Sequence, residues 1–144
     1  MRKIYFILAA ICLTGNTVLA QDVFGEWYSI DPDTGANESV IRVYEKNNKV
    51  YGQIITILKE EDKDKTCIEC SGDDKDKPIE GLVIMKGLEK DGTEYNGGKI
   101  LDPKNGKYYK CYIELEEKNK LKLRGYIGFS MLGRTEYWNR VEAK

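Results

Sequence analysis

After its first twenty positions the chain is dominated by short runs of β-branched, aliphatic and aromatic residues. In one run, Tyr109, Cys111, Ile113 and Leu115 share one face, while charged or polar residues occupy most of the positions between them. Successive side chains of a β-strand point to opposite faces, so this alternation predicts a strand with one face in a core and one in water. The run over 121–127 alternates in the same way.

Eight such runs can be counted, and segments rich in Asn, Asp and Gly separate most of them. These residues accept the positive φ angles of tight turns, so the pattern is typical of consecutive hairpins. Apolar spacing of three and four residues does not persist outside the first twenty positions, so no helix is predicted there. The expected strands are 24–30, 39–45, 50–58, 82–88, 95–101, 108–115, 121–127 and 134–141.

An antiparallel sheet of this size must protect its two edge strands, and closing the sheet on itself does so. We therefore predict an all-β fold, an eight-stranded antiparallel up-and-down barrel, in one domain over residues 21–144. A two-sheet sandwich is the alternative that the same pattern permits. Eight strands enclose an interior just wide enough for side chains or for one small ligand.

Residues 1–20 have the features of an export signal. Arg2 and Lys3 precede an apolar run over 4–13, and Val18-Leu19-Ala20 supplies residues that a signal peptidase reads. The apolar run is shorter than the roughly 20 residues that cross a bilayer, which argues against an N-terminal membrane anchor. We expect cleavage after Ala20, a chain exported to the periplasm or the extracellular space, and no membrane span in the mature protein.

The composition excludes several kinds of chemistry. The chain has no His, which removes His-based acid–base catalysis, Ser-His-Asp systems and imidazole zinc sites. Its 23 basic and 24 acidic residues are interspersed, which argues against a nucleic-acid partner. We expect a protein that is not an enzyme and has no cofactor, with a pair of carboxylates left open as the catalytic alternative.

Three cysteines follow the export signal. Because exported cysteines tend to pair, we expect a structural disulfide, either between Cys67 and Cys70 or from one of them to Cys111. A redox-active pair and a metal site are the alternatives, but no helix N-terminus is predicted at Cys67 and the ligand set is incomplete. Cys111 alternates with apolar residues and should be buried. The carboxylates of 73–76 lack the EF-hand pattern, so no metal site is predicted.

Aromatic residues and arginines in the strands are candidates for a ligand site. Ten Tyr suit β-strands for their propensity alone, but they could also line a pocket. An inward-pointing Arg would suit an anionic head group, whereas Arg124 alternates against the apolar set and should face outward. The candidate ligand-binding residues are Trp27, Arg42, Tyr109, Arg134 and Trp138.

Several phrases of the sequence together resemble one bacterial family. The most specific lie over 123–128, which reads Leu-Arg-Gly-Tyr-Ile-Gly, and over 133–141. Earlier ones lie over 25–27, 51–54 and 97–103. They are similar to the exported family called domain of unknown function 2147, over essentially the whole chain after residue 20. The resemblance implies a lipocalin-like barrel and no particular activity.

Gly25 and Trp27 in the first strand also resemble the lipocalin and calycin superfamily. In that superfamily a Trp packs at the base of the barrel and a basic residue of the last strand lies across it. The resemblance implies that Arg140 or Arg134 covers Trp27 and closes one end of the barrel. A guanidinium on an indole face contributes about 0.5–2 kcal/mol.

Two functions fit these features. The first is an exported barrel that binds a small lipophilic or amphipathic molecule in its interior. The second is a non-enzymatic envelope protein with a solid barrel core, whose loops bind another envelope protein. Phe129, Met131 and Leu132 form an apolar turn before the last strand, where polar residues are expected, and this turn favours the second function.

Overall fold

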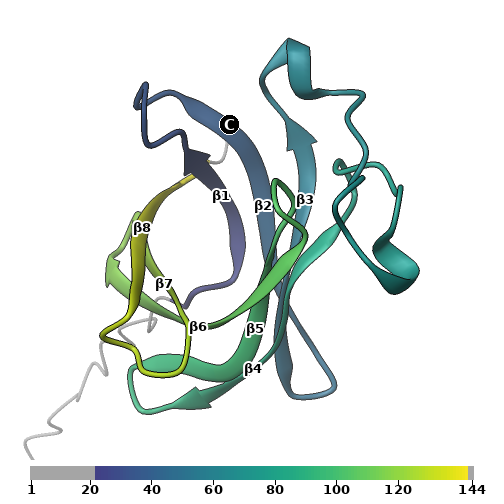
Figure 1. The fold of residues 1–144 in the computed structure, drawn as a ribbon. Helices are drawn as coiled ribbons and strands as arrows, with labels where there is room; N and C mark the ends of the chain where they lie inside the picture. The colour runs from purple at the N-terminus through teal and green to yellow at the C-terminus, as the bar shows by residue number, and fades with distance from the viewer. Residues whose placement is uncertain (1–21, 143–144) are drawn as a thin grey trace, which may run out of the picture.

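The computed structural model describes residues 22–142 and shows eight antiparallel strands that close into a barrel in sequence order (Figure 1). The predicted up-and-down barrel is therefore confirmed, and the sandwich is not formed. The predicted export signal, 1–20, lies outside the described residues. The strands are β1 (Gly25–Ile30), β2 (Asn37–Lys46), β3 (Lys49–Ile57), β4 (Val83–Asp91), β5 (Glu94–Asp102), β6 (Lys107–Glu117), β7 (Lys120–Tyr126) and β8 (Gly133–Arg140).

Two-residue hairpin turns join alternate pairs of strands at one end of the barrel, which we call the closed end. Between β2 and β3, Asn47 and Asn48 both have positive φ, 52° and 61°, as a type I′ turn requires. Gly92, with φ of 64°, serves the β4–β5 hairpin. The connections at the closed end are 47–48, 92–93 and 118–119.

Longer loops occupy the opposite end, which we call the open end, because successive strands reverse direction. They are 31–36, 58–82, 103–106 and 127–132. The β3–β4 loop is the longest and contains two short helices, η1 (Glu60–Asp62) and η2 (Gly72–Asp74). Figure 1 shows this teal loop standing out from the ends of β3 and β4.

A disulfide between Cys67 and Cys70 holds the β3–β4 loop. Both cysteines are buried, and the Cys67 Sγ lies 3.6 Å from the carbonyl oxygen of Pro103 in the β5–β6 turn. Gly106 of that turn approaches so closely that a Cβ there would lie 1.9 Å from the carbonyl oxygen of Glu69. The disulfide-bonded part of the loop is thus packed against the β5–β6 turn.

The solid part of the core lies toward the closed end. Trp27, Leu88, Ile113 and Leu121 are fully buried there. The Trp27 indole N–H donates a hydrogen bond of 3.0 Å to the carbonyl of Val23, which ties the segment before β1 to the core. Burial of such large apolar side chains is the main force that stabilises the barrel.

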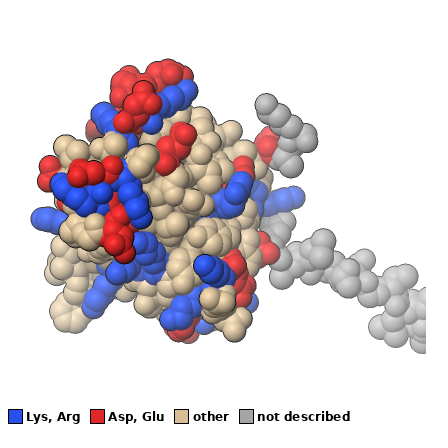
Figure 2. Space-filling model, turned by 90° about the vertical axis from the view of Figure 1, so that its right-hand side faces the viewer, with Lys and Arg blue, Asp and Glu red and all other residues tan. Residues whose placement is uncertain are grey.

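The outer surface mixes charges of both signs. Figure 2 shows Lys and Arg interspersed with Asp and Glu over the face drawn, with no stripe of one sign. Residues 22–142 contain no helix that is long and apolar enough to cross a membrane.

Candidate functional site

A cavity of about 600 Å³ occupies the barrel near the open end. All four open-end loops contribute to its lining, and no closed-end turn does. The wall formed by β3 to β7 is mainly apolar, because the inward positions of these strands are aliphatic. Ile54, Ile84, Ile100 and Leu123 are examples. Cavities of a few hundred Å³ with apolar walls and a few polar groups are typical of small-molecule sites.

The wall formed by β2, β1 and β8 is more polar. We call five of its inward side chains the polar strip: Ser39, Ser29, Arg134, Glu136 and Trp138. The hydroxyls of Ser29 and Ser39 are 2.6 Å apart, and the two side chains are paired across β1 and β2. Arg134 and Glu136 form an ion pair along β8. The strip gives the cavity one wall of hydrogen-bonding groups opposite an apolar wall.

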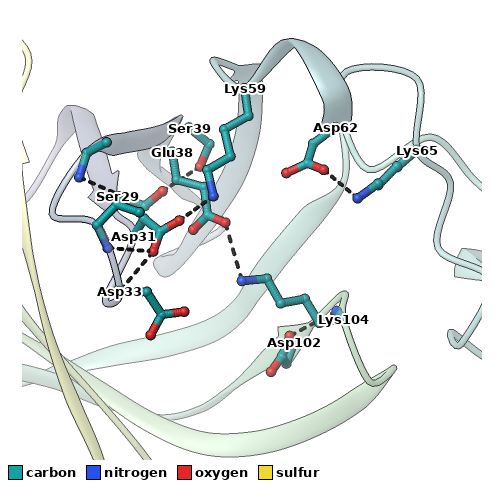
Figure 3. Close-up of polar contacts among 12 residues, drawn as sticks. Ser29, Asp31, Asp33, Glu38, Ser39, Lys59, Asp62, Lys65, Asp102 and Lys104 are labelled. Atoms are coloured by element: carbon teal, nitrogen blue, oxygen red, sulfur yellow. Dashed lines mark hydrogen bonds and ion pairs between the residues drawn. The ribbon is translucent and has the colours of Figure 1, made fainter.

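Ion pairs surround the mouth of the cavity (Figure 3). The Lys104 Nζ, in the β5–β6 turn, lies 3.3 Å from the Glu38 Oε1 on β2, a strand that is adjacent to neither β5 nor β6 in the barrel. Lys65 pairs with Asp62 at 2.5 Å in the β3–β4 loop. The first pair connects the β5–β6 turn to β2, and the second lies within the β3–β4 loop.

Asp31 fixes the β1–β2 loop beside the mouth. Its Oδ1 accepts hydrogen bonds from the backbone N–H groups of Asp33 and Thr34, at 2.8 and 3.2 Å, and its other oxygen accepts from Lys59. The hydrogen bond from Lys59, followed by the backbone bond from Asp33, lowers the pKa of Asp31 from 3.8 to about 2. The carboxylate therefore stays ionised and holds the loop at all but strongly acidic pH.

An apolar turn between β7 and β8 forms another part of the rim. Phe129 and Met131 are 76% and 87% exposed, and Ile127 and Leu132 line the cavity as well as facing solvent. Arg124 holds this turn from outside, because its guanidinium donates to the carbonyls of Ser130 and Met131 and to the hydroxyl of Thr135. The exposure of these apolar side chains is therefore fixed by the local hydrogen bonds.

Three of the predicted ligand-binding residues line the cavity: Tyr109, Arg134 and Trp138. Tyr109 accepts a hydrogen bond of 2.9 Å at its hydroxyl from the Asn105 side chain, which joins β6 to the β5–β6 turn. Trp138 is the lining residue of β8 nearest the closed end, and its indole N–H has no hydrogen-bond partner among residues 22–142.

Trp27 and Arg42, the other two residues predicted to bind a ligand, do not line the cavity. Trp27 is fully buried at the closed end, away from the open-end loops. Arg42 lies on the outer face of β2, where it pairs with Glu26 at 2.9 Å, because its neighbours Ile41 and Val43 take the inward positions. Strict alternation on β2 leaves no inward position for Arg42.

Arg140 covers Trp27 at the closed end. Its guanidinium lies 4.2 Å from the centroid of the indole ring. The same group donates to the carbonyls of Phe24, Asp22 and Lys118 at 2.9 to 3.0 Å. Arg134, the other Arg considered for this contact, is at the open end instead. The contact is structural and separate from the cavity.

None of the three cysteines among residues 22–142 lines the cavity. Cys67 pairs with Cys70, and Cys111 is free and buried among the inward side chains of the barrel. Burial raises the pKa of the Cys111 thiol to about 12, so the thiolate does not form at neutral pH. No group of three or more His, Cys, Asp or Glu in 22–142 could hold a metal ion.

Ser29, Ser39, Glu38 and Glu136 were not predicted as site residues. A signal for the serines is present in the sequence, since Ser29 is two positions from Trp27 and Ser39 is two positions from Ile41. Both serines therefore occupy inward positions that a filled core would give to apolar residues. A polar residue at the inward parity of a strand is the pattern that marks the wall of a cavity here.

Comparison with known proteins agrees with this architecture. The profile of the family described as an uncharacterised protein conserved in bacteria, domain of unknown function 2147, matches residues 25–140. A solved structure, described as protein HP1028 from Helicobacter pylori and as belonging to the lipocalin family, is similar with a TM-score of 0.73 and 20% identity over 84% of each chain. A search of curated proteins gave no significant match.

Proposed function

This chain belongs to the bacterial family domain of unknown function 2147, whose profile matches the whole barrel, and we propose that it is an exported binding protein without enzymatic activity. It holds one small, partly apolar molecule at the open end. The observation that carries this proposal is the cavity of about 600 Å³, which has one apolar wall, one polar strip and an opening among the loops. Its size falls within the range of sites for small molecules.

The distribution of polar groups supports binding of an amphipathic molecule. Apolar surface buried against the wall of β3 to β7 would supply most of the affinity, at roughly 25 cal/mol per Å². The serine pair and the charged groups at the mouth would orient the polar end of the molecule. The similarity to a lipocalin agrees with this use of the barrel, but shared fold alone does not determine a ligand.

The chemistry of the cavity favours binding over catalysis. The chain has no His to act as a general base near neutral pH. Asp31 at the mouth has its pKa lowered by Lys59, the opposite of what a carboxyl general acid needs. Each of these observations supports a site that recognises a molecule without transforming it.

Filling the cavity tests the proposal. Gly125 lies on β7 in the cavity wall, and a Cβ there would meet its nearest atoms, on Ile100 and Tyr109, at 3.9 and 4.0 Å, which is ordinary contact. A larger side chain at this position would therefore project into the cavity without a clash at its base. We expect Gly125→Leu to weaken binding of the fluorescent probe N-phenylnaphthylamine at least about tenfold while the barrel stays folded.

Lys122→Leu, on the outward face of the same strand, is the matched control and should bind the probe like the wild type. Circular dichroism and the melting temperature of each variant report on the fold. Failure of the wild-type protein to bind this probe, or equal binding by Gly125→Leu, would contradict a ligand site in the barrel.

A second candidate function rests on the apolar turn of Phe129 and Met131. This turn could contact an envelope protein, since large exposed apolar side chains on a fixed turn are typical of interaction sites. Cross-linking in intact cells would test this: Met131→Asp should lose an adduct that Gly125→Leu keeps. An adduct present with both variants, or with neither, would count against a docking role for the turn.

A further inference from the structure

We propose that the molecule held in the cavity is an uncharged amphiphile whose carbonyl or hydroxyl oxygen accepts a hydrogen bond from the Ser29–Ser39 pair. This inference rests on the proposed binding function and specifies the chemistry of the ligand.

The proton count of the serine pair carries the argument. Each hydroxyl has one proton and two lone pairs. The 2.6 Å contact between the two oxygens uses one proton, and neither side chain has another hydrogen-bond partner among residues 22–142. The remaining O–H is therefore an unpaired donor. Ser29 and Ser39 are only 8% and 7% exposed, and both line the cavity.

Buried donors are almost always satisfied, so an unpaired one in a cavity wall indicates a partner from outside the chain. The indole N–H of Trp138, on the neighbouring strand β8, is a second buried donor that lacks a partner within 22–142. The buried part of the polar strip thus contains two donors, the serine O–H and the Trp138 N–H, that have no partner within 22–142. A ligand oxygen beside the Ser29–Ser39 pair would accept a hydrogen bond from the free serine O–H. The apolar part of the ligand would then lie against the wall of β3 to β7.

The charges around the cavity disfavour an ionised ligand. Each cation in the lining already has a carboxylate partner: Lys65 with Asp62, Lys104 with Glu38, and Arg134 with Glu136. Asp102 adds a carboxylate that has no cationic partner among the described residues. An anionic head group would have to displace one of these carboxylates, and Glu38 directly precedes Ser39. A cationic head group without an acceptor oxygen would leave the serine proton unpaired.

Matched ligands and serine variants provide the test. The dissociation constants of methyl decanoate and of the decanoate anion are measured by displacement of N-phenylnaphthylamine. We expect the uncharged ester to bind wild-type protein more tightly than the anion. The double variant Ser29→Ala/Ser39→Ala should weaken ester binding roughly 3- to 10-fold, the usual net effect of one hydrogen bond.

The single variants give the sharper readout. In Ser29→Ala or Ser39→Ala the remaining hydroxyl loses its mutual bond and keeps a free proton, so ester binding should stay within about twofold of the wild type. Loss in the double variant alone is a signature that a packing defect would not produce. Ser71→Ala, an exposed serine in the β3–β4 loop, is the control.

Three results would overturn the inference while leaving the cavity intact as a binding site. They are unchanged ester binding in the double variant, equal losses in both single variants, and tighter binding of decanoate than of the ester. Absence of probe binding by the wild type is a different result, because it would contradict the proposed function itself.

Discussion

Arg140 lies over the ring of Trp27 with its guanidinium 4.2 Å from the indole centroid. Trp27 lies on β1 and Arg140 is the last residue of β8, so this contact joins the first strand to the last. The ladder between these strands is short, with only Trp27↔Arg140 and Tyr28↔Asn139 in register. The hydrogen bonds of Arg140 to the carbonyls of Asp22 and Phe24 extend the junction beyond the ladder.

Replacing Arg140 should therefore weaken the closure of the barrel. We expect Arg140→Ala to lower the free energy of unfolding by about 2–3 kcal/mol, because it removes a cation–π contact and several charge-assisted hydrogen bonds. Urea denaturation followed by Trp fluorescence measures this change. Arg134→Ala on the same strand is the control, since its largely exposed side chain makes one ion pair and its loss should cost less than about 1 kcal/mol. Equal effects would show that the closed-end contact is unimportant.

The Asp31–Lys59 pair makes stability depend on pH in the acidic range. The folded pKa of Asp31 lies at about 2, below its usual 3.8, chiefly because Lys59 donates a hydrogen bond to it. The stabilisation is therefore complete above about pH 4 and is lost as pH falls toward about 2. Asp31→Asn should be less stable than wild type near neutral pH, and the difference should shrink across that acidic window. A constant difference across that window would exclude the linkage.

Thiol chemistry should separate Cys111 from the other two cysteines. In the folded barrel Cys111 is buried and its pKa is raised to about 12, so a thiol reagent should not modify it at neutral pH. After unfolding in denaturant without reductant, protein that begins at residue 21 should show one reactive thiol, since Cys67 and Cys70 are paired. Mass spectrometry of the labelled protein counts the modified thiols. Rapid labelling in the folded state would contradict the burial of Cys111.

The disulfide should contribute modestly to stability, because it closes a very short loop. In the chain-entropy account, linking Cys67 to Cys70 is worth about 2 kcal/mol. The double variant Cys67→Ala/Cys70→Ala should lose about that amount and should expose the β3–β4 loop to proteolysis before the barrel itself. Cleavage within the barrel strands first would show that the disulfide supports the whole fold rather than the loop.

Two glycines inside strands should respond to the same substitution by different amounts. A Cβ at Gly98 would lie 2.4 Å from the backbone oxygen of Lys86, so Gly98→Ala should force the β4–β5 ladder apart at a cost of about 1–3 kcal/mol. A Cβ at Gly125 meets only ordinary contacts, and Gly125→Ala should change stability by less than about 1 kcal/mol. The melting temperatures of the two variants decide this comparison.

The fold could be predicted from the sequence because local patterns and global closure agree. Alternation at Tyr109, Cys111 and Ile113 gave the inward face of β6, and the structure has the same parity there. Segments rich in Asn, Asp and Gly indicated hairpin turns, and the positive φ angles of Asn47 and Asn48 confirm the one between β2 and β3. Strand bounds shifted by a few residues, as for β2, which begins at Asn37 rather than at residue 39.

The site was less predictable than the fold, because the cavity depends on how side chains from several strands pack together, and the sequence of one strand does not determine this. Arg42 was expected near a ligand from its residue type, but the packing of Ile41 and Val43 turns it outward. The Ser29–Ser39 pair depends on the register between β1 and β2, and a one-residue shift would send one serine to the opposite face. Register and inter-strand partners are set by the assembled sheet.

The placement of the Trp27–Arg140 contact at the closed end has a consequence for protein engineering. The groups that fasten the first strand to the last lie away from the four loops of the mouth. Loops of new length or composition could be grafted at the mouth without changing the Trp27–Arg140 contact between β1 and β8. The molecule therefore offers a small scaffold for tailored receptors, in which recognition can be redesigned separately from folding.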